Sequence, residues 1–270
     1  MQAGPAHVEA ELRALNAALE RQLHERAAEL EAAKRELEAF GYSVSHDLRA
    51  PLRTIDGFSK ILEEDYAGRI DEEGRDALRR VRGAAQKMAE QIDDLLKLSR
   101  VSRAELSRAT VDLGALARAI ANQLQAGAPG RSTLFEIPPR LEAWGDRAML
   151  ALVLENLLGN AWKFTSRHPG ARIELGVAAK AGEPVYFVRD DGAGFDMAGA
   201  QNLFAPFQRL HGVSEFAGTG IGLAIVRRAV QRHGGRVWAE GAVEKGAAFY
   251  FTLPAAGGEA PAQAPAAALA

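Results

Sequence analysis

The sequence contains no cysteine among its 270 residues. This absence excludes a disulfide-bonded scaffold, a thiolate metal site and catalysis by a cysteine nucleophile. Long hydrophobic runs are also missing, because the longest clear one, residues 148–154, is far shorter than the roughly 18 residues that a membrane-spanning helix needs. The N-terminus has no apolar signal core either. We therefore expect a cytoplasmic chain without a membrane segment.

The sequence also lacks an excess of charge of one sign. Its 33 basic residues face 35 acidic ones, which gives a net charge of -2. A broadly basic surface for nucleic acid is thereby excluded. Since a domain usually has about 100–200 residues, the length corresponds to one or two domains and suffices for a hydrophobic core. The function must therefore be sought in the motifs.

The first forty residues predict one long helix with a narrow apolar seam, flanked by Glu, Arg, Gln and Lys. Such a seam indicates a coiled coil, which we assign to residues 1–38. A monomeric surface helix is the alternative, but no nearby segment would cover its seam. The seam residues, spaced by three, four or seven, are Leu12, Leu15, Leu19, Leu23, Ala27, Leu30, Leu37 and Val44.

Residues 39–106 predict a helical hairpin. The helical pattern continues to Tyr66, residues 67–71 break it, and a second apolar stripe runs to Leu98. Two such helices provide only half a core. We therefore expect a homodimer that closes a four-helix bundle.

Residues 107–254 mix helix and strand patterns, which predicts an α/β sandwich with helices on one sheet face and, with the hairpin, an α+β fold. Residues 255–270, rich in Ala, Pro and Gly, predict a disordered tail. The expected helices cover 113–124, 147–164 and 223–233, and the expected strands cover 133–137, 173–178, 185–189, 237–240 and 248–253.

His46 differs from an ordinary surface histidine because Pro51 follows it inside a strong helical pattern. Proline lacks a backbone N–H and clashes with the carbonyl of Asp47, which is expected to bend the helix beside His46. An exposed imidazole next to a carboxylate is a candidate nucleophile with a base or orienting partner. A histidine without function remains the alternative on these residues alone.

Asn156, Asn160 and Lys163 follow one another at i, i+4 and i+7, which places them on one helix face. Amide oxygens and an ammonium group suit a hydrated Mg²⁺ beside phosphates. The alternative is that the two asparagines bond backbone groups near the helix end.

Two glycine clusters flank a long connection. Asp190 ends an expected strand and is followed by Gly192 and Gly194, while Gly218–Thr219–Gly220–Ile221–Gly222 opens a helix whose free N–H groups would face a phosphate. Neither cluster matches the dinucleotide fingerprint or the Walker-type phosphate loop, and either could be a turn. Residues 195–217 between them are a candidate mobile lid.

Taken in order, these motifs resemble the H, N, G1, F and G2 boxes of the transmitter core of a sensor histidine kinase, over about residues 35–254. The wording of the H and F boxes is most similar to soluble, phytochrome-type kinases. The resemblance implies that His46 is the phosphoacceptor, Asp47 its acid/base partner, Asp190 the adenine ligand and Asn160 the Mg²⁺ ligand. The nucleotide-binding residues that it implies are Asn156, Asn160, Lys163, Phe164, Asp190, Gly192, Gly194, Phe204, Phe207, Gly218, Thr219, Gly220, Gly222 and Leu223.

The same resemblance implies transfer of a phosphoryl group from ATP to His46 and then to an aspartate of a response-regulator receiver domain. It also implies an upstream sensor domain, which we expect to lie outside this chain. Two alternatives are an ATPase of the same superfold and an inactive dimeric scaffold. The ATPase is disfavoured because Asn156 stands where such enzymes carry a water-activating glutamate. Ala50 stands where many kinases carry Thr or Asn, which predicts weak phosphatase activity.

Overall fold

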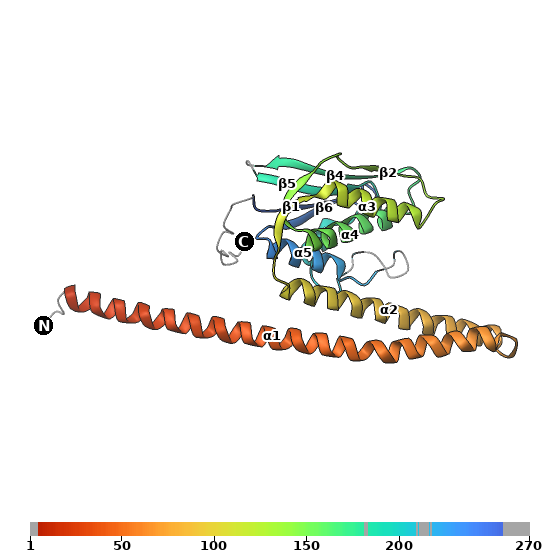
Figure 1. Cartoon of the computed structure of the whole chain (residues 1–270), viewed down its shortest axis with the longest axis horizontal. Helices are drawn as coiled ribbons and strands as arrows, with labels where there is room; N and C mark the ends of the chain where they lie inside the picture. The colour runs from red at the N-terminus through yellow and green to blue at the C-terminus, as the bar shows by residue number, and fades with distance from the viewer. Residues whose placement is uncertain (1–4, 181–182, 209, 211–215, 217, 256–270) are drawn as a thin grey trace.

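A computed structural model describes residues 5–180, 183–208, 210, 216 and 218–255. The chain begins with one helix, α1 (Pro5–Asp65), which is followed by a short 3-10 turn, η1 (Ala67–Arg69), and an antiparallel helix, α2 (Glu72–Arg103). The N-terminal half of α1 extends beyond the rest of the molecule, while α2 returns along its C-terminal half (Figure 1). The predicted long helix and hairpin are thus confirmed. The expected tail, residues 255–270, lies almost wholly outside the described residues.

The apolar seam of α1 is exposed in the single chain. Leu23, for example, is 69% exposed, and its seam neighbours Leu15, Leu19 and Leu30 are exposed as well. The helix is not interrupted at Pro51. Burial of exposed leucines at coiled-coil spacing under a second helix is favourable, because it removes apolar surface from water. This face of α1 is therefore suited to a partner helix.

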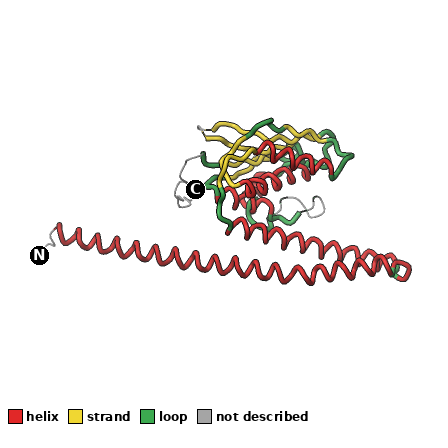
Figure 2. The backbone as a smooth tube through the Cα atoms, viewed as in Figure 1, coloured by secondary structure: helices red, strands yellow, loops and turns green. Residues whose placement is uncertain are grey.

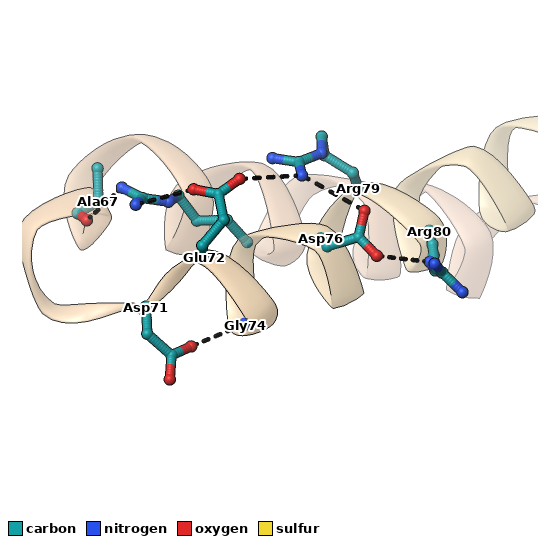
Figure 3. Close-up of polar contacts among 8 residues, drawn as sticks. Ala67, Asp71, Glu72, Gly74, Asp76, Arg79 and Arg80 are labelled. Atoms are coloured by element: carbon teal, nitrogen blue, oxygen red, sulfur yellow. Dashed lines mark hydrogen bonds and ion pairs between the residues drawn. The ribbon is translucent and has the colours of Figure 1, made fainter.

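The start of α2 is defined by a side-chain cap. Asp71 accepts a hydrogen bond from the backbone N–H of Gly74 at 2.8 Å, which satisfies one of the free donors of the first turn (Figure 3). On the next turn Arg79 contacts the carboxylates of Glu72 and Asp76. The predicted break at residues 67–71 is therefore confirmed, and the cap explains why the helix restarts there.

The hairpin has only a small core of its own. Arg49 of α1 pairs with Asp93 of α2 at 2.6 Å, and Arg82 of α2 pairs with Asp56 and Glu63 of α1. The buried apolar residues between the helices are Leu52, Ala85, Ile92 and Leu96. Large apolar residues that stay exposed on the same helices are Ile55, Phe58, Ile61, Leu62, Val81 and Met88.

The second half of the chain is a mixed sheet with helices packed on it (Figure 2). The strand order is β2-β4-β5-β7-β6, with β2 and β4 parallel and the other neighbours antiparallel. Fully buried leucines of α4 form one core with apolar residues of β4, β5 and β7. The α+β class is confirmed. The elements are α3 (Leu113–Ala126), β2 (Thr133–Glu136), α4 (Arg147–Phe164), β4 (Ala171–Lys180), β5 (Glu183–Asp190), η2 (Met197–Asn202), α5 (Gly222–Arg232), β6 (Val237–Gly241) and β7 (Ala247–Thr252).

A separate two-stranded sheet was not predicted. It pairs β1 (Arg108–Asp112) with β3 (Glu142–Asp146) in antiparallel register. Both strands are five residues long and interrupt their apolar positions with charge or glycine, so they carry no clear period-2 pattern. Across the described residues, no helix is at once long and apolar enough to cross a membrane.

His233 illustrates a histidine used only for packing. It is fully buried at the end of α5, its Nε2 accepts the backbone N–H of Asp146 at 2.8 Å, and its Nδ1 lies 2.7 Å from the carbonyl of Ala229. Burial lowers the pKa of the ring. Because Nε2 accepts a hydrogen bond, the ring is neutral, and it links β3 to the end of α5.

Candidate functional site

One cavity, of about 170 Å³, lies at the junction of α4, the end of β5, the glycine segment before α5 and the helix α2. Its wall combines polar side chains, several of them from α4, with a group of aromatic and aliphatic side chains. The residues that line it are Asp94, Asn156, Asn160, Lys163, Phe164, Asp190, Gly194, Phe195, Leu203, Gln208, Leu210, Phe216, Gly218, Thr219, Gly220, Gly222, Leu223, Ala247 and Phe249.

The helix α4 supplies the polar side of the wall. Asn156, Asn160 and Lys163 all line the cavity, as expected for one helix face. The side-chain N–H of Asn156 donates to the backbone carbonyl of Leu152 at 2.7 Å. The backbone-bonding alternative is therefore right for the amide nitrogen of Asn156, while its Oδ1 faces Gly222 at the start of α5. Glu155 is exposed and is not among the described lining residues.

Asp190 places a buried carboxylate at the end of β5. Its side chain is 5% exposed, and Oδ1 accepts the backbone N–H of Gly192 at 2.9 Å. Burial raises the pKa of this carboxyl from 3.8 to about 6, and the nearby charge of Asp191 adds to the effect. A desolvated acceptor of this kind is suited to an N–H donor of a ligand, such as an exocyclic amine.

At two positions of the site, steric crowding explains why the residue is glycine. Gly194 has a φ of 60°, and a Cβ there would lie 1.8 Å from the carbonyl oxygen of Ala242. A Cβ at Gly222 would lie 2.4 Å from Oδ1 of Asn156. A larger residue is thus excluded at Gly194 by the backbone, whereas at Gly222 it would require the Asn156 side chain to shift.

The N-terminus of α5 is suited to an anion. The residue before it, Ile221, makes no side-chain capping bond, and the first residue of the helix is Gly222. The free N–H groups of the first turn and the positive end of the helix dipole therefore meet the cavity together with Lys163. This side of the cavity is suited to phosphate groups.

The two phenylalanines of the F-box-like segment lie away from the cavity wall. Phe204 is partly buried against the domain core. Phe207 is 55% exposed, has a φ of 65° and donates its backbone N–H to the carbonyl of Gly220 at 2.9 Å. Neither is among the described lining residues, and the contact of Phe207 with the glycine segment is this backbone hydrogen bond. Residues 209, 211–215 and 217 of the expected lid lie outside the described residues.

Several lining residues were missed from the sequence. The apolar wall comes from Phe195, Leu203, Phe216 and Phe249, whose hydrophobic character is the same in a core as in a pocket. Asp94 comes from α2, in the other half of the chain, and no local motif distinguishes it from other helix-surface carboxylates. Gly192 serves by binding Asp190 rather than by lining the cavity.

His46 lies on α1, and Asp47 beside it is exposed. Among the described residues of the cavity wall there is none from α1. The two halves nevertheless meet across α2, because Arg49, one turn after His46, binds Asp93, the neighbour of the wall residue Asp94. The candidate phosphoacceptor helix and the cavity are therefore on either side of one short stretch of α2.

The cavity wall could hold a hard cation only together with oxygen atoms of a bound ligand. Among the residues that the structure describes, no group of three or more His, Asp or Glu side chains could hold a metal alone. Asn160 contributes a carboxamide to the wall on the same face as Lys163. One protein oxygen, with phosphate oxygens and water, is an ordinary arrangement for Mg²⁺, so the residues present fit this ion.

Two family models match the chain. Residues 36–103 match the His Kinase A (phospho-acceptor) domain, and residues 145–257 match the histidine kinase-, DNA gyrase B- and HSP90-like ATPase domain.

The proteins that are similar to this chain include phytochromes and histidine kinases. The chain is 36% identical over 228 residues to cyanobacterial phytochrome B of Nostoc sp. and 37% identical over 236 residues to the methanogenesis regulatory histidine kinase FilI of Methanothrix harundinacea. These alignments cover 83% and 86% of the chain but 30% and 26% of the relatives, so the chain spans less than a third of their length. Full-length ShkA, solved in complex with AMPPNP, is 28% identical with a TM-score of 0.55, over 79% of this chain and 46% of that one.

Proposed function

The chain belongs to the histidine kinases, as a phosphoacceptor domain followed by an ATPase-type domain, and from this premise we propose that it transfers the γ-phosphoryl group of ATP to His46. The observation that carries the proposal is the cavity in which a buried carboxylate, an asparagine-lysine face and an uncapped helix N-terminus lie around one space. Those are the groups that adenine and a triphosphate require.

The adenine base and the phosphates of ATP bind to different residues of the cavity. Asp190 accepts a hydrogen bond from the exocyclic amine of adenine, and the apolar wall covers the base. Lys163 and the first turn of α5 hold the phosphates. Asn160 holds Mg²⁺, which when bound neutralises charge on the phosphate oxygens.

Phosphoryl transfer then depends mainly on positioning. A ring nitrogen of His46 attacks the γ-phosphorus in line, a P–N bond forms, the bond to the bridging oxygen breaks and ADP leaves. Asp47 orients the imidazole and takes up the proton that the ring loses. Phosphohistidine is the donor for an aspartate of a response-regulator receiver domain.

The wider organisation is part of the same proposal. We assign residues 1–38 to a signalling coiled coil, 39–106 to dimerisation and phosphotransfer, 107–254 to ATP binding and 255–270 to a tail. The exposed apolar residues of α1 and α2 support a homodimer closed as a four-helix bundle, and we propose that this homodimer is cytoplasmic. An upstream sensor domain would act through the coiled coil on how His46 is presented.

Incubation with γ-labelled ATP and Mg²⁺ tests the activity. We expect acid-labile, base-stable label on the wild type and on His24→Gln, a matched histidine on the exposed surface of α1, but none on His46→Gln. Asn160→Ala and Gly218→Ala are expected to abolish labelling as well. Free phosphate without labelled protein would favour the ATPase, and neither product would favour the scaffold.

A further inference from the structure

The last turn of α4 is held from outside the nucleotide cavity by an arginine. Arg131, in the loop between α3 and β2, donates from Nη2 to the hydroxyl of Thr165 at 2.7 Å. The carbon of its guanidinium also lies 3.9 Å from the ring centre of Trp162. Phe135 of β2 stacks on the same indole, with the two ring centres 5.8 Å apart. Arg131 is not among the described residues that line the cavity, so its contribution to the site is indirect.

The hydroxyl of Thr165 links this arginine to the backbone of α4. The Thr165 side chain is fully buried, and its Oγ1 donates to the carbonyl of Ala161 at 2.6 Å. The backbone N–H of Thr165 donates to the same carbonyl at 3.1 Å. Because the last carbonyls of a helix have no partner within the helix, these bonds keep the final turn of α4 in helical geometry. The hydroxyl that donates to Ala161 also accepts from Arg131, so the three groups form one continuous hydrogen-bond chain.

The positive charge of Arg131 is suited to this end of the helix. The aligned carbonyls give the C-terminus of a helix a partial negative charge. Arg131 is half-buried, and burial lowers the pKa of its guanidinium. A partly desolvated cation interacts more strongly with these carbonyls and with an indole face than it would in water. Its removal would take from the buried hydroxyl of Thr165 its donor and leave the last turn less firmly held.

Lys163 belongs to the turn that Arg131 holds. It follows Trp162 directly, and its side chain lines the cavity. Its ammonium group lies beside the glycine segment, since a Cβ on Gly218 would be 3.2 Å from Nζ of Lys163. Successive residues of a helix point about 100° apart, so Trp162 meets Arg131 on one face of the turn and Lys163 meets the cavity on another. A shift of this turn would therefore move Nζ relative to the phosphate side of the cavity.

We propose that Arg131 is a positioning residue of the nucleotide site, which fixes the last turn of α4 so that Lys163 meets the phosphates of ATP. The inference rests on the proposed function, because Lys163 is assigned to phosphate only if the cavity binds ATP. Arg131 acts through Lys163 and makes no contact of its own with the nucleotide. The guanidinium group is required, since a lysine would keep the charge but lacks the flat face that stacks on Trp162 and the fixed fork that reaches Thr165.

ATP affinity of the full chain, measured by calorimetry with Mg²⁺, tests this role. We expect Arg131→Ala to raise the Kd about three- to tenfold, which is part of the contribution of one hydrogen bond to a charged group. Arg131→Lys should lie closer to Arg131→Ala than to wild type, because charge alone does not hold the turn. Thr165→Val, which removes the acceptor hydroxyl, should raise the Kd in the same range and decides the question if Arg131→Ala does not fold.

Arg118 provides a matched control. It is half-buried in the same domain, on α3, and its guanidinium donates to the carbonyl of Pro138 at 2.6 Å. It is not among the described lining residues either, so Arg118→Ala should keep the Kd within about twofold of wild type. Melting curves of all variants define a temperature at which each is fully folded. An equal rise in Kd for Arg118→Ala would indicate general loosening of the domain and would overturn the positioning role.

Combination with Lys163→Ala separates positioning from stability alone. If Arg131 acts through Lys163, then Lys163→Ala and the double variant should have the same Kd within about twofold. Losses that multiply in the double variant would overturn the proposal, and so would an unchanged Kd for Arg131→Ala when the wild type binds ATP. Absence of ATP binding in the wild type would instead overturn the proposed function, and the role of Lys163 with it. The two failures are therefore distinguishable.

Discussion

Asp190→Asn should make the nucleotide-binding domain more stable while removing its preference for adenine. The wild-type carboxylate is buried, and burial raises its pKa from 3.8 to about 6. A shift of about two pKa units corresponds to about 3 kcal/mol, which the folded state loses whenever this group is ionised. An asparagine has nearly the same shape and keeps an oxygen for the N–H of Gly192, but it carries no charge.

The sign of the pH dependence follows from the raised pKa. At pH 8 the carboxylate is ionised in both states and the folded state bears the full desolvation cost, whereas near pH 4 it is neutral in the folded state and the cost disappears. The backbone N–H of Ala247 also stabilises the wild-type carboxylate, and an amide replaces this only in part. We therefore expect Asp190→Asn to gain about 1–3 kcal/mol at pH 8 and close to nothing near pH 4.

Urea denaturation followed by tryptophan fluorescence measures this gain. All three tryptophans, Trp144, Trp162 and Trp238, lie in the nucleotide-binding domain, so the signal reports on that domain. Asp65→Asn, a carboxylate at the exposed end of α1, is the control and should change nothing. A destabilised Asp190→Asn at pH 8, or a gain of the same size at both pH values, would refute the reasoning. Binding of ATP should fall at least tenfold in the same variant, since the acceptor for the adenine amine is lost.

Three further predictions concern other parts of the molecule. Gly194→Ala should destabilise the domain by more than about 2 kcal/mol in the same urea assay, because its φ is 60° and the Cβ would meet the carbonyl of Ala242, whereas Gly159→Ala, with open space around it, should be tolerated. Phe58→Asp should convert a dimer to a monomer in sedimentation, with helix content kept, since this side chain is exposed in the single chain; a dimer that persists would contradict the bundle. Ala50→Thr should raise removal of phosphate from the phosphorylated regulator at least tenfold over wild type, and equal rates would contradict the role assigned to this position.

Long elements could be predicted because their signal is local and repeated. The helix α4 has the predicted bounds, Arg147–Phe164, since its leucines recur at one period over the whole helix. The strands β1 and β3 were missed because they are short and carry no clear period-2 pattern, and their pairing joins segments about thirty residues apart. Short polar strands are decided by the partner that they find, which no window of sequence contains.

In the candidate site, too, the residues that belong to a local pattern could be predicted and the others could not. The face of Asn156, Asn160 and Lys163 follows from helix geometry alone, and Asp190 follows from its place at the end of a strand. The sequence could not predict which phenylalanines line the cavity, because an aromatic residue is as suitable for a core as for a pocket. Phe195 and Phe249 line the cavity, whereas Phe204 and Phe207 are not among its described lining residues.

By itself, the sequence determined the two-part division of the chain, the helix faces, the strand ends and the family to which the motifs point. Each of these depends on residues close together in the chain or on motifs in a given order. Only the tertiary structure decided the burial that raises the pKa of Asp190 and the pairing of Asp94 with Thr219, which are 125 positions apart. Burial and electrostatics depend on what surrounds a group in space, and contacts of this separation arise only when the chain is folded.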